Sequence, residues 1–169
     1  LFSFFIIPVM MVGCVSSTTK VPQNNNIGKR IYIPQEQVTI TRPIPNKIEP
    51  ASYRIWLNQG ENYARVREYE QFLTRNNLAH IIPSFELLRS ARDWQRCGRA
   101  EYAVPSRELW GNSLSTLRVF KALVAARILT DFEVTSVYRD LPLNQCAGGA
   151  GSSRHLFNSA IDFRIGPEY

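Results

Sequence analysis

The chain has 169 residues, of which 44% are hydrophobic, 20% charged and 11% aromatic, and its formal net charge is +6 at pH 7. This composition excludes a fibrous or wholly disordered protein and predicts one globular domain, to which the first fifty residues need not belong. Half of the net charge, +3, lies in residues 20–50, and the rest is spread over residues 51–169. Because the basic residues form no single cluster, we expect no nucleic-acid partner.

An apolar run, LFSFFIIPVMMV, opens the sequence and is followed by Gly13, Cys14 and a polar stretch. The run is too short to span a bilayer and is typical of the hydrophobic region of a signal peptide. The segment MVGC resembles a bacterial lipobox, in which Cys14 would be diacylated and become the first residue of the mature protein. We therefore expect residues 1–13 to be an incomplete lipoprotein signal peptide and Cys14 to anchor the protein in a membrane. A buried apolar segment with an incidental cysteine is the alternative interpretation.

A proline-rich and asparagine-rich stretch follows, with five prolines and three consecutive asparagines in residues 21–50. It contains too few large apolar residues to offset the entropy that ordering would cost. We expect residues 14–50 to be a flexible tether that holds a domain at residues 51–169 away from the membrane.

Three segments with a helical period of apolar residues come next. The first covers residues 61–76 and the third covers residues 113–129. The second is predicted over residues 85–97, with Ser84 as its N-cap. The apolar period then changes to two in residues 132–138 and again in residues 160–165, which predicts two strands. Helices followed by a small antiparallel sheet are typical of an α+β fold.

Two cysteines, Cys97 and Cys146, lie within the expected domain. In an exported protein an isolated pair of this kind is most simply a disulfide. The alternative of a metal-binding pair lacks the short C-x-x-C spacing. A thiol nucleophile would need a nearby base, for which the chain offers only His80 and His155. We expect the disulfide.

The segment between the two predicted strands concentrates the residues that could carry chemistry. Its GGAG sequence lacks the Gly-Lys-Ser/Thr ending of a phosphate-binding loop. His155 and Asp162 are seven positions apart, so they can share one zinc ion only if the chain doubles back between them. Asn158 and Ser159 favour such a turn. On spacing alone, an ordinary surface histidine and an unrelated aspartate explain the pair equally well.

A family resemblance carries the argument further. Ser153-Arg154-His155 with Ala160-Ile161-Asp162 resembles the S-x-H-x-x-G-x-A-x-D signature of the M15 family of zinc D-alanyl-D-alanine carboxypeptidases. TSVYR, residues 135–139, is similar to that family's strand ending in Tyr-Arg, and LNQCAGGA, residues 143–150, is similar to its linking segment. The resemblance implies the fold of the zinc D-Ala-D-Ala carboxypeptidases, which is hedgehog-like.

The same resemblance implies roles for four residues. His155 and Asp162 would be the first two ligands of a Zn²⁺ ion. Arg139 would bind a substrate oxygen and stabilise the negative charge of the tetrahedral intermediate. Ser153 would orient the substrate or a ligand by hydrogen bonding. The implied substrates are peptidoglycan peptides that contain D-amino acids, cleaved at the periplasmic face of the bacterial cell envelope.

Without the resemblance, two of these residues have simpler interpretations. Arg139 would form a surface salt bridge with Asp140 or Glu133, and Ser153 would cap a turn. Carboxypeptidase and endopeptidase action are equally compatible with the pattern.

The chain departs from the family pattern in two respects. Asn158 stands at the position of the signature's glycine, which suits a site that needs a left-handed backbone. The family also requires a third ligand, a histidine beyond the aspartate, and an acidic general base. We expect both beyond residue 169, so that residues 51–169 would lack the C-terminal part of the domain and be inactive, and we expect His80 to be a packed or capping residue. The alternative function is that of a non-catalytic cell-wall-binding or structural envelope lipoprotein.

Overall fold

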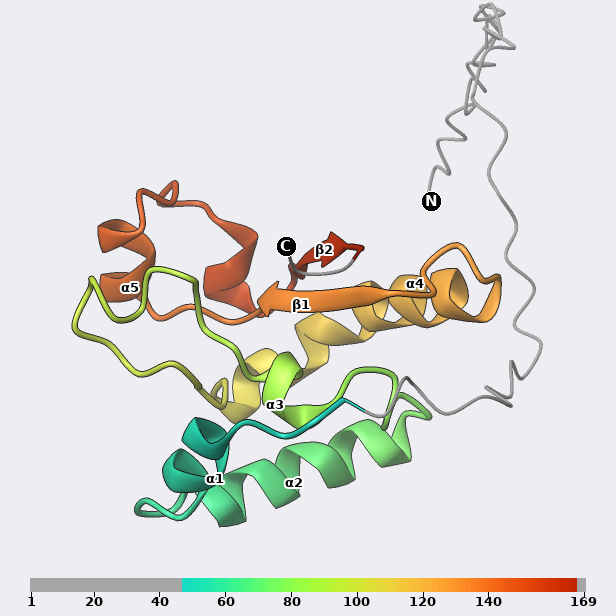
Figure 1. Cartoon of the computed structure of the whole chain (residues 1–169), viewed down its shortest axis with the longest axis horizontal. Helices are drawn as coiled ribbons and strands as arrows, with labels where there is room; N and C mark the ends of the chain where they lie inside the picture. The colour runs from blue at the N-terminus through green and yellow to red at the C-terminus, as the bar shows by residue number, and fades with distance from the viewer. Residues whose placement is uncertain (1–46, 167–169) are drawn as a thin grey trace, which may run out of the picture. The chain divides into compact units, whose positions relative to one another are not determined.

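A computed structural model describes residues 47–166 of the chain (Figure 1). The expected signal peptide at residues 1–13, the lipidation site Cys14 and most of the expected tether lie outside the described residues. No helix within the described part combines the length and the apolar character that crossing a membrane requires.

Helices dominate the first part of the described chain, and the sheet lies in the second part (Figure 1). The first elements are α1 (Ala51–Leu57), α2 (Asn62–Arg75), α3 (Ser84–Leu87), the 3₁₀ helix η1 (Arg107–Asn112) and α4 (Ser113–Ala125). They are followed by β1 (Phe132–Ser136), α5 (Leu141–Cys146), the 3₁₀ helix η2 (Arg154–Phe157) and β2 (Asp162–Ile165). The two strands pair antiparallel. This mixed architecture with a small antiparallel sheet agrees with the α+β class predicted from the sequence.

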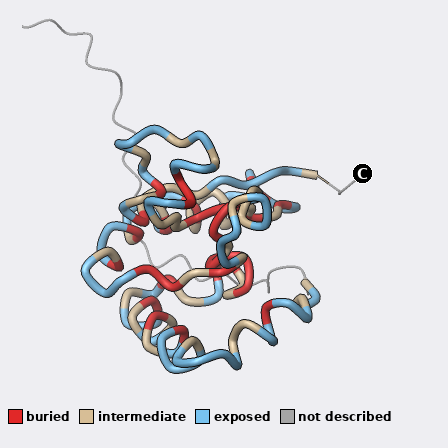
Figure 2. Tube along the Cα trace, turned by 90° about the vertical axis from the view of Figure 1, so that its left-hand side faces the viewer, coloured by how far each residue is buried: buried red, intermediate tan, exposed pale blue. Residues whose placement is uncertain are grey.

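The hydrophobic core lies between the helices and the inner face of β1, where buried positions gather inside the fold (Figure 2). Each long helix contributes one apolar stripe, as its helical period predicts. The buried side chains of α2, α4 and β1 that build this core include Val66, Tyr69, Leu73, Leu117, Phe120, Phe132 and Val134. The rings of Phe120 and Phe132 meet edge to face, with centroids 5.0 Å apart, and so join α4 to β1.

The sheet begins regularly and becomes irregular where it approaches the predicted site. Along β1, buried and half-buried residues alternate, which confirms the predicted period of two. Val134 pairs with Phe163, but the register shifts before the next pair, Ser136 with Asp162. A bulge of this kind bends a strand and redirects the side chains that follow it. Residues 137–139 follow directly after this shift.

The helix predicted over residues 85–97 is wrong in its extent, because α3 ends at Leu87. Ser84 is the first residue of this helix, and its side chain makes no capping hydrogen bond. Arg89 instead forms an isolated antiparallel bridge with Tyr102. Pairing with a segment distant in the sequence therefore replaces the local helical hydrogen bonds at this point.

The predicted first and third helices are confirmed as α2 and α4, although α4 ends at Ala125 rather than at residue 129. Arg127 has a left-handed backbone, with φ of 58°. The Ile128 amide donates to the Leu123 carbonyl at 3.0 Å, as in a Schellman motif. This closing turn ends the helix although the apolar period continues.

The predicted disulfide between Cys97 and Cys146 is present in the structure, with the two Cα atoms 5.8 Å apart. It joins the loop after α3 to the last residue of α5. Two segments that are 49 positions apart in the sequence are thereby linked.

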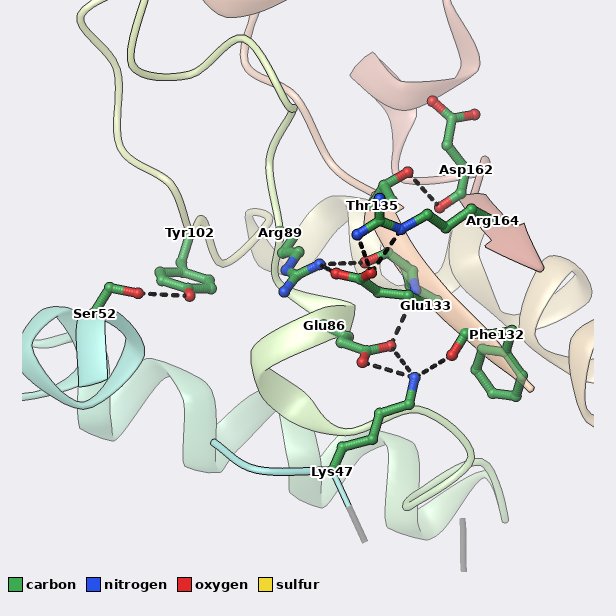
Figure 3. A network of polar contacts seen from close by, with 11 residues as sticks. Lys47, Ser52, Glu86, Arg89, Tyr102, Phe132, Glu133, Thr135, Asp162 and Arg164 are labelled. Atoms are coloured by element: carbon green, nitrogen blue, oxygen red, sulfur yellow. Dashed lines mark hydrogen bonds and ion pairs between the residues drawn. The ribbon is translucent and has the colours of Figure 1, made fainter. Parts of the chain in front are cut away.

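The folded part begins before residue 51. Lys47 Nζ lies 2.7 Å from Oε1 of the buried Glu86 and 4.6 Å from the centroid of the Phe132 ring. The other carboxylate oxygen of Glu86 accepts from the Val134 amide at 3.0 Å (Figure 3). Lys47, near the end of the expected tether, is therefore fixed to α3 and β1.

Candidate functional site

Three segments bring the predicted site residues together: the chain just after β1, the helix η2 and the first residue of β2. Arg139 follows β1, His155 lies in η2, and Asp162 begins β2. The Arg139 amide donates to the His155 carbonyl at 3.2 Å, which ties the first two segments by their backbones. Sheet pairing of Ser136 with Asp162 ties the third.

The reversal of the chain between His155 and Asp162 is made by Asn158. Its backbone is left-handed, with φ of 53° and ψ of 38°, and its amide donates to the His155 carbonyl at 3.2 Å. The side chain is buried, and its Nδ2 donates to the Leu109 carbonyl at 3.3 Å. The signature's glycine position thus has a left-handed backbone, which asparagine can adopt.

The tautomer of His155 is set by its surroundings. The imidazole is buried, and its Nδ1 lies 2.6 Å from the Val137 carbonyl oxygen. Since a carbonyl oxygen can only accept, Nδ1 must carry the hydrogen, and in the neutral ring Nε2 then holds the lone pair. This Nε2 lies 3.2 Å from Asp162 Oδ2. A lone pair and a carboxylate oxygen therefore face each other, an arrangement that needs a proton or a cation between them.

The separation of these two atoms fits two ligands of one zinc ion. Zinc-to-nitrogen and zinc-to-oxygen bonds of about 2.0 to 2.2 Å place two tetrahedral ligand atoms roughly 3.4 Å apart. The Nε2 of His155 and Oδ2 of Asp162 are 3.2 Å apart. Residues 47–166 contain no group of three or more His, Cys, Asp or Glu side chains that could hold a metal ion. The described part of the site thus offers two protein ligands.

Arg139 faces the same carboxylate. Its Nη2 donates to Asp162 Oδ2 at 2.7 Å, and its Nε donates to Ser136 Oγ at 2.9 Å. The guanidinium is mostly buried, with 15% of the side chain exposed. A fixed cation therefore lies directly beside the proposed metal ligands.

The simpler interpretation of Arg139, a salt bridge, agrees with the structure in kind but not in the suggested partners, Asp140 and Glu133. Asp140 pairs with Arg99, and Glu133 is bound by two other arginines. The carboxylate that Arg139 contacts is that of Asp162.

Ser153 lies directly before η2, where its backbone starts the helix. Its carbonyl accepts from the Leu156 amide at 3.1 Å, and its amide donates to the Ala150 carbonyl at 3.0 Å. Ser153 therefore occupies the cap position of this turn, as its simpler interpretation predicts, but its hydroxyl makes no capping hydrogen bond. Ser153 is near His155 in the sequence, but within residues 47–166 its hydroxyl makes no hydrogen bond to the other site residues.

A second cluster of charges lies on the same sheet, around Glu133 (Figure 3). Its carboxylate binds Arg89 and Arg164. Partial burial acts to raise the pKa of Glu133, but hydrogen bonds and attraction from the two guanidiniums outweigh it and lower the pKa. In Figure 3 the Asp162 carboxylate points away from this cluster, while its backbone carbonyl accepts from the Thr135 hydroxyl at 3.3 Å. Glu133 is thus a charged, paired residue rather than a free general base.

His80 is the other histidine that the sequence analysis considered. His80 is exposed, so it is not a packed residue, and its backbone is left-handed, with φ of 60°. It lines a hollow of about 140 Å³ beside α2, together with Glu70 and Thr74.

In the glycine-rich loop, a Cβ on Gly149 would lie 2.2 Å from Asn144 Oδ1, so this position has room only for glycine.

Sequence reasoning missed two contributors to the site, the Val137 carbonyl and the Ser136 hydroxyl. A backbone carbonyl leaves no trace in the residue pattern. Ser136 could have been found, because it occupies a buried position in the alternating strand, where a hydroxyl needs a partner.

No protein-family model, no curated protein and no solved structure matches this chain. The site's geometry and the residue pattern around it are therefore the basis for any function proposed for this chain.

Proposed function

We propose that the protein is a zinc-dependent peptidase of the M15 kind, which hydrolyses peptide bonds containing D-amino acids in peptidoglycan. The observation that carries the proposal is the placement of His155 Nε2 at 3.2 Å from Asp162 Oδ2, with the opposite ring nitrogen bound to the Val137 carbonyl. A histidine fixed by a carbonyl in this way is the usual support of a zinc ligand. The S-x-H and A-x-D residue pattern supports the choice of substrate.

The residues of the chain have separate tasks in this proposal. His155 and Asp162 would hold the zinc ion, which when bound polarises the scissile carbonyl and lowers the pKa of a water molecule. The Val137 carbonyl keeps the His155 lone pair on Nε2. Arg139 presents a desolvated positive charge beside the ligands, where it can stabilise negative charge that develops on the substrate oxygen.

The proposal extends to the fold and to the place of action. We assign the described domain to the hedgehog-like fold of the zinc D-Ala-D-Ala carboxypeptidases, and we place it at the periplasmic face of the bacterial envelope through a lipid on Cys14. Since residues 47–166 supply two metal ligands, we expect these residues alone to bind zinc weakly.

Zinc titration calorimetry tests the metal site. We expect one weak site per chain, lost in His155→Ala and in Asp162→Ala because one remaining ligand cannot hold the ion against water. His80→Ala is the matched control, since it removes the other of the chain's 2 histidines, and it should bind zinc as the unaltered chain does. Unchanged zinc binding in His155→Ala would overturn the proposal.

Hydrolysis of a D-Ala-D-Ala-terminated muropeptide by the protein tests the activity. Arg139→Ala should retain zinc and lose about 10²-fold to 10³-fold in kcat, because its charge acts in the transition state. Protein that binds zinc but releases no D-alanine would contradict the peptidase proposal. If such a protein sediments with purified peptidoglycan, the alternative of a non-catalytic cell-wall-binding lipoprotein takes its place.

A further inference from the structure

We propose that Ser136 is a positioning residue for Arg139, holding the guanidinium in the orientation in which it faces Asp162. The catalytic consequence rests on the proposed function, whereas the positioning itself is a property of the fold. Ser136 acts through Arg139 and makes no contact with the two proposed metal ligands other than its strand pairing with Asp162.

The hydrogen of the Ser136 hydroxyl has a defined direction. Ser136 is 2% exposed, and its Oγ lies 2.6 Å from the Ser90 carbonyl oxygen and 2.9 Å from Arg139 Nε. A hydroxyl has one hydrogen, and the Ser90 carbonyl can only accept, so the hydrogen goes to Ser90. The lone pairs of Oγ then remain for the N–H of Arg139 Nε. Both partners thus fix the hydroxyl in one orientation.

The carbonyl that orients this hydroxyl is itself firmly held. Ser90 is buried, its amide donates to the Glu101 carbonyl at 2.9 Å, and its Oγ donates to the Ala100 carbonyl at 2.7 Å. The anchor of Ser136 is therefore a backbone segment fixed on both sides. Because the hydroxyl and its backbone are already fixed, binding to them costs only the conformational entropy of the arginine side chain itself.

Two bonds at different places of the guanidinium determine how Arg139 lies. Its Nε donates to Ser136, and its Nη2 donates to Asp162. Within residues 47–166, these are the acceptors that the structure gives to the side chain. A planar guanidinium bound at two points cannot rotate about its terminal bonds. Loss of the Ser136 contact leaves the single contact with Asp162, about which the group can swing.

The first arm of the test measures catalysis by the protein with zinc. Ser136→Ala should lower kcat about tenfold, less than Arg139→Ala, with KM and zinc affinity nearly unchanged, because the charge remains but is misplaced. Ser136→Thr keeps the hydroxyl and should recover most of kcat. Ser113→Ala is the matched control, since Ser113 is also a buried serine, donates to the Trp110 carbonyl and touches none of the proposed site residues.

The second arm does not depend on any activity. In nitrogen-15 spectra, the Nε–H of Arg139, assigned by its absence in Arg139→Lys, should exchange slowly with water in the unaltered chain and in Ser136→Thr. In Ser136→Ala it should exchange as fast as an exposed arginine, while Ser113→Ala should leave it slow. A slow Nε–H that persists in Ser136→Ala would overturn the positioning.

The two arms separate the failure of this inference from the failure of the proposed function. If the unaltered protein hydrolyses no muropeptide, the peptidase proposal fails and the exchange measurement still decides whether Ser136 positions Arg139. If Arg139→Ala loses activity and Ser136→Ala does not, despite fast exchange, the catalytic role of the positioning is refuted.

Discussion

The disulfide between Cys97 and Cys146 should contribute a large part of the domain's stability. It closes a loop whose ends are 49 positions apart, and it joins two segments that have little regular structure of their own. Helix α5 has 6 residues, too few to form a stable isolated helix in water. The bond therefore fixes α5, and with it the Asp140 cap, which accepts from the Leu143 amide at 2.9 Å.

The expected magnitude follows from the length of the loop. Cross-linking a loop of about 50 residues removes roughly 14 cal/mol/K of entropy from the unfolded chain, or about 4 kcal/mol at room temperature, in the chain-entropy model. The double replacement Cys97→Ser with Cys146→Ser should thus lower the free energy of unfolding by about 4 kcal/mol. For a domain of this size, that loss is a large fraction of the total of about 5 to 15 kcal/mol.

Urea unfolding at equilibrium, followed by circular dichroism, measures the effect. A Cys14→Ala background prevents exchange with the third of the chain's 3 cysteines. Both forms must be compared in that background, once with the disulfide and once with both serines. A loss below about 1 kcal/mol, or two free thiols in the oxidised protein after denaturation, would refute the reasoning.

Three further predictions concern single positions. Arg127→Gly should stabilise the domain by about 1 kcal/mol in urea unfolding, because φ of 58° at the end of α4 strains the arginine backbone but suits glycine. No gain in stability would contradict this account of the helix end. Gly149→Ala should destabilise by about 1 to 3 kcal/mol, because its Cβ would meet Asn144 Oδ1 at 2.2 Å, and an unchanged midpoint would refute that packing. The pKa of Glu133 is lower in the folded protein than in the unfolded chain, so its carboxylate stabilises the fold above the unfolded-state pKa. This stabilisation is lost as the pH falls through the folded-state pKa, so Glu133→Gln should make the free energy of unfolding depend less on pH in the acid range. An unchanged pH dependence would exclude Glu133 as its source.

The elements that the sequence predicted well are those that local pattern determines. The apolar periods of α2 and β1 coincide with their buried faces, since each buries one side against the same core. The reversal at Asn158 was also predictable, because asparagine tolerates the left-handed backbone found there. These features need no knowledge of distant parts of the chain.

The features that the sequence could not predict depend on contacts between distant segments. Nothing local stops a helix at Leu87, which ends because Arg89 pairs with Tyr102. The ion pair of Lys47 with the buried Glu86, which extends the domain into the expected tether, likewise depends on tertiary structure. Which charged residues pair in this way depends on which of them are buried, and burial is known only once the fold is known.

The site itself was predicted in part. The pattern brought His155, Asp162 and Arg139 into one hypothesis, and the structure places their side chains in direct contact. The pattern did not include the Val137 carbonyl or the orientation of the Ser136 hydroxyl. The Val137 carbonyl decides which nitrogen of His155 is available to a metal, and the Ser136 hydroxyl decides which way Arg139 points.

The central claim, that Nε2 of His155 is a metal ligand opposite Asp162, is tested most directly by nitrogen-15 spectra of the two histidine rings. In the zinc-bound protein, His155 should carry its hydrogen on Nδ1 and none on Nε2. Addition of zinc should shift the Nε2 resonance of His155, leave that of His80 unchanged at one equivalent, and have no such effect in Asp162→Ala. A His155 ring that keeps a hydrogen on Nε2 when zinc is present, or one whose Nε2 resonance does not respond to zinc, would contradict the account.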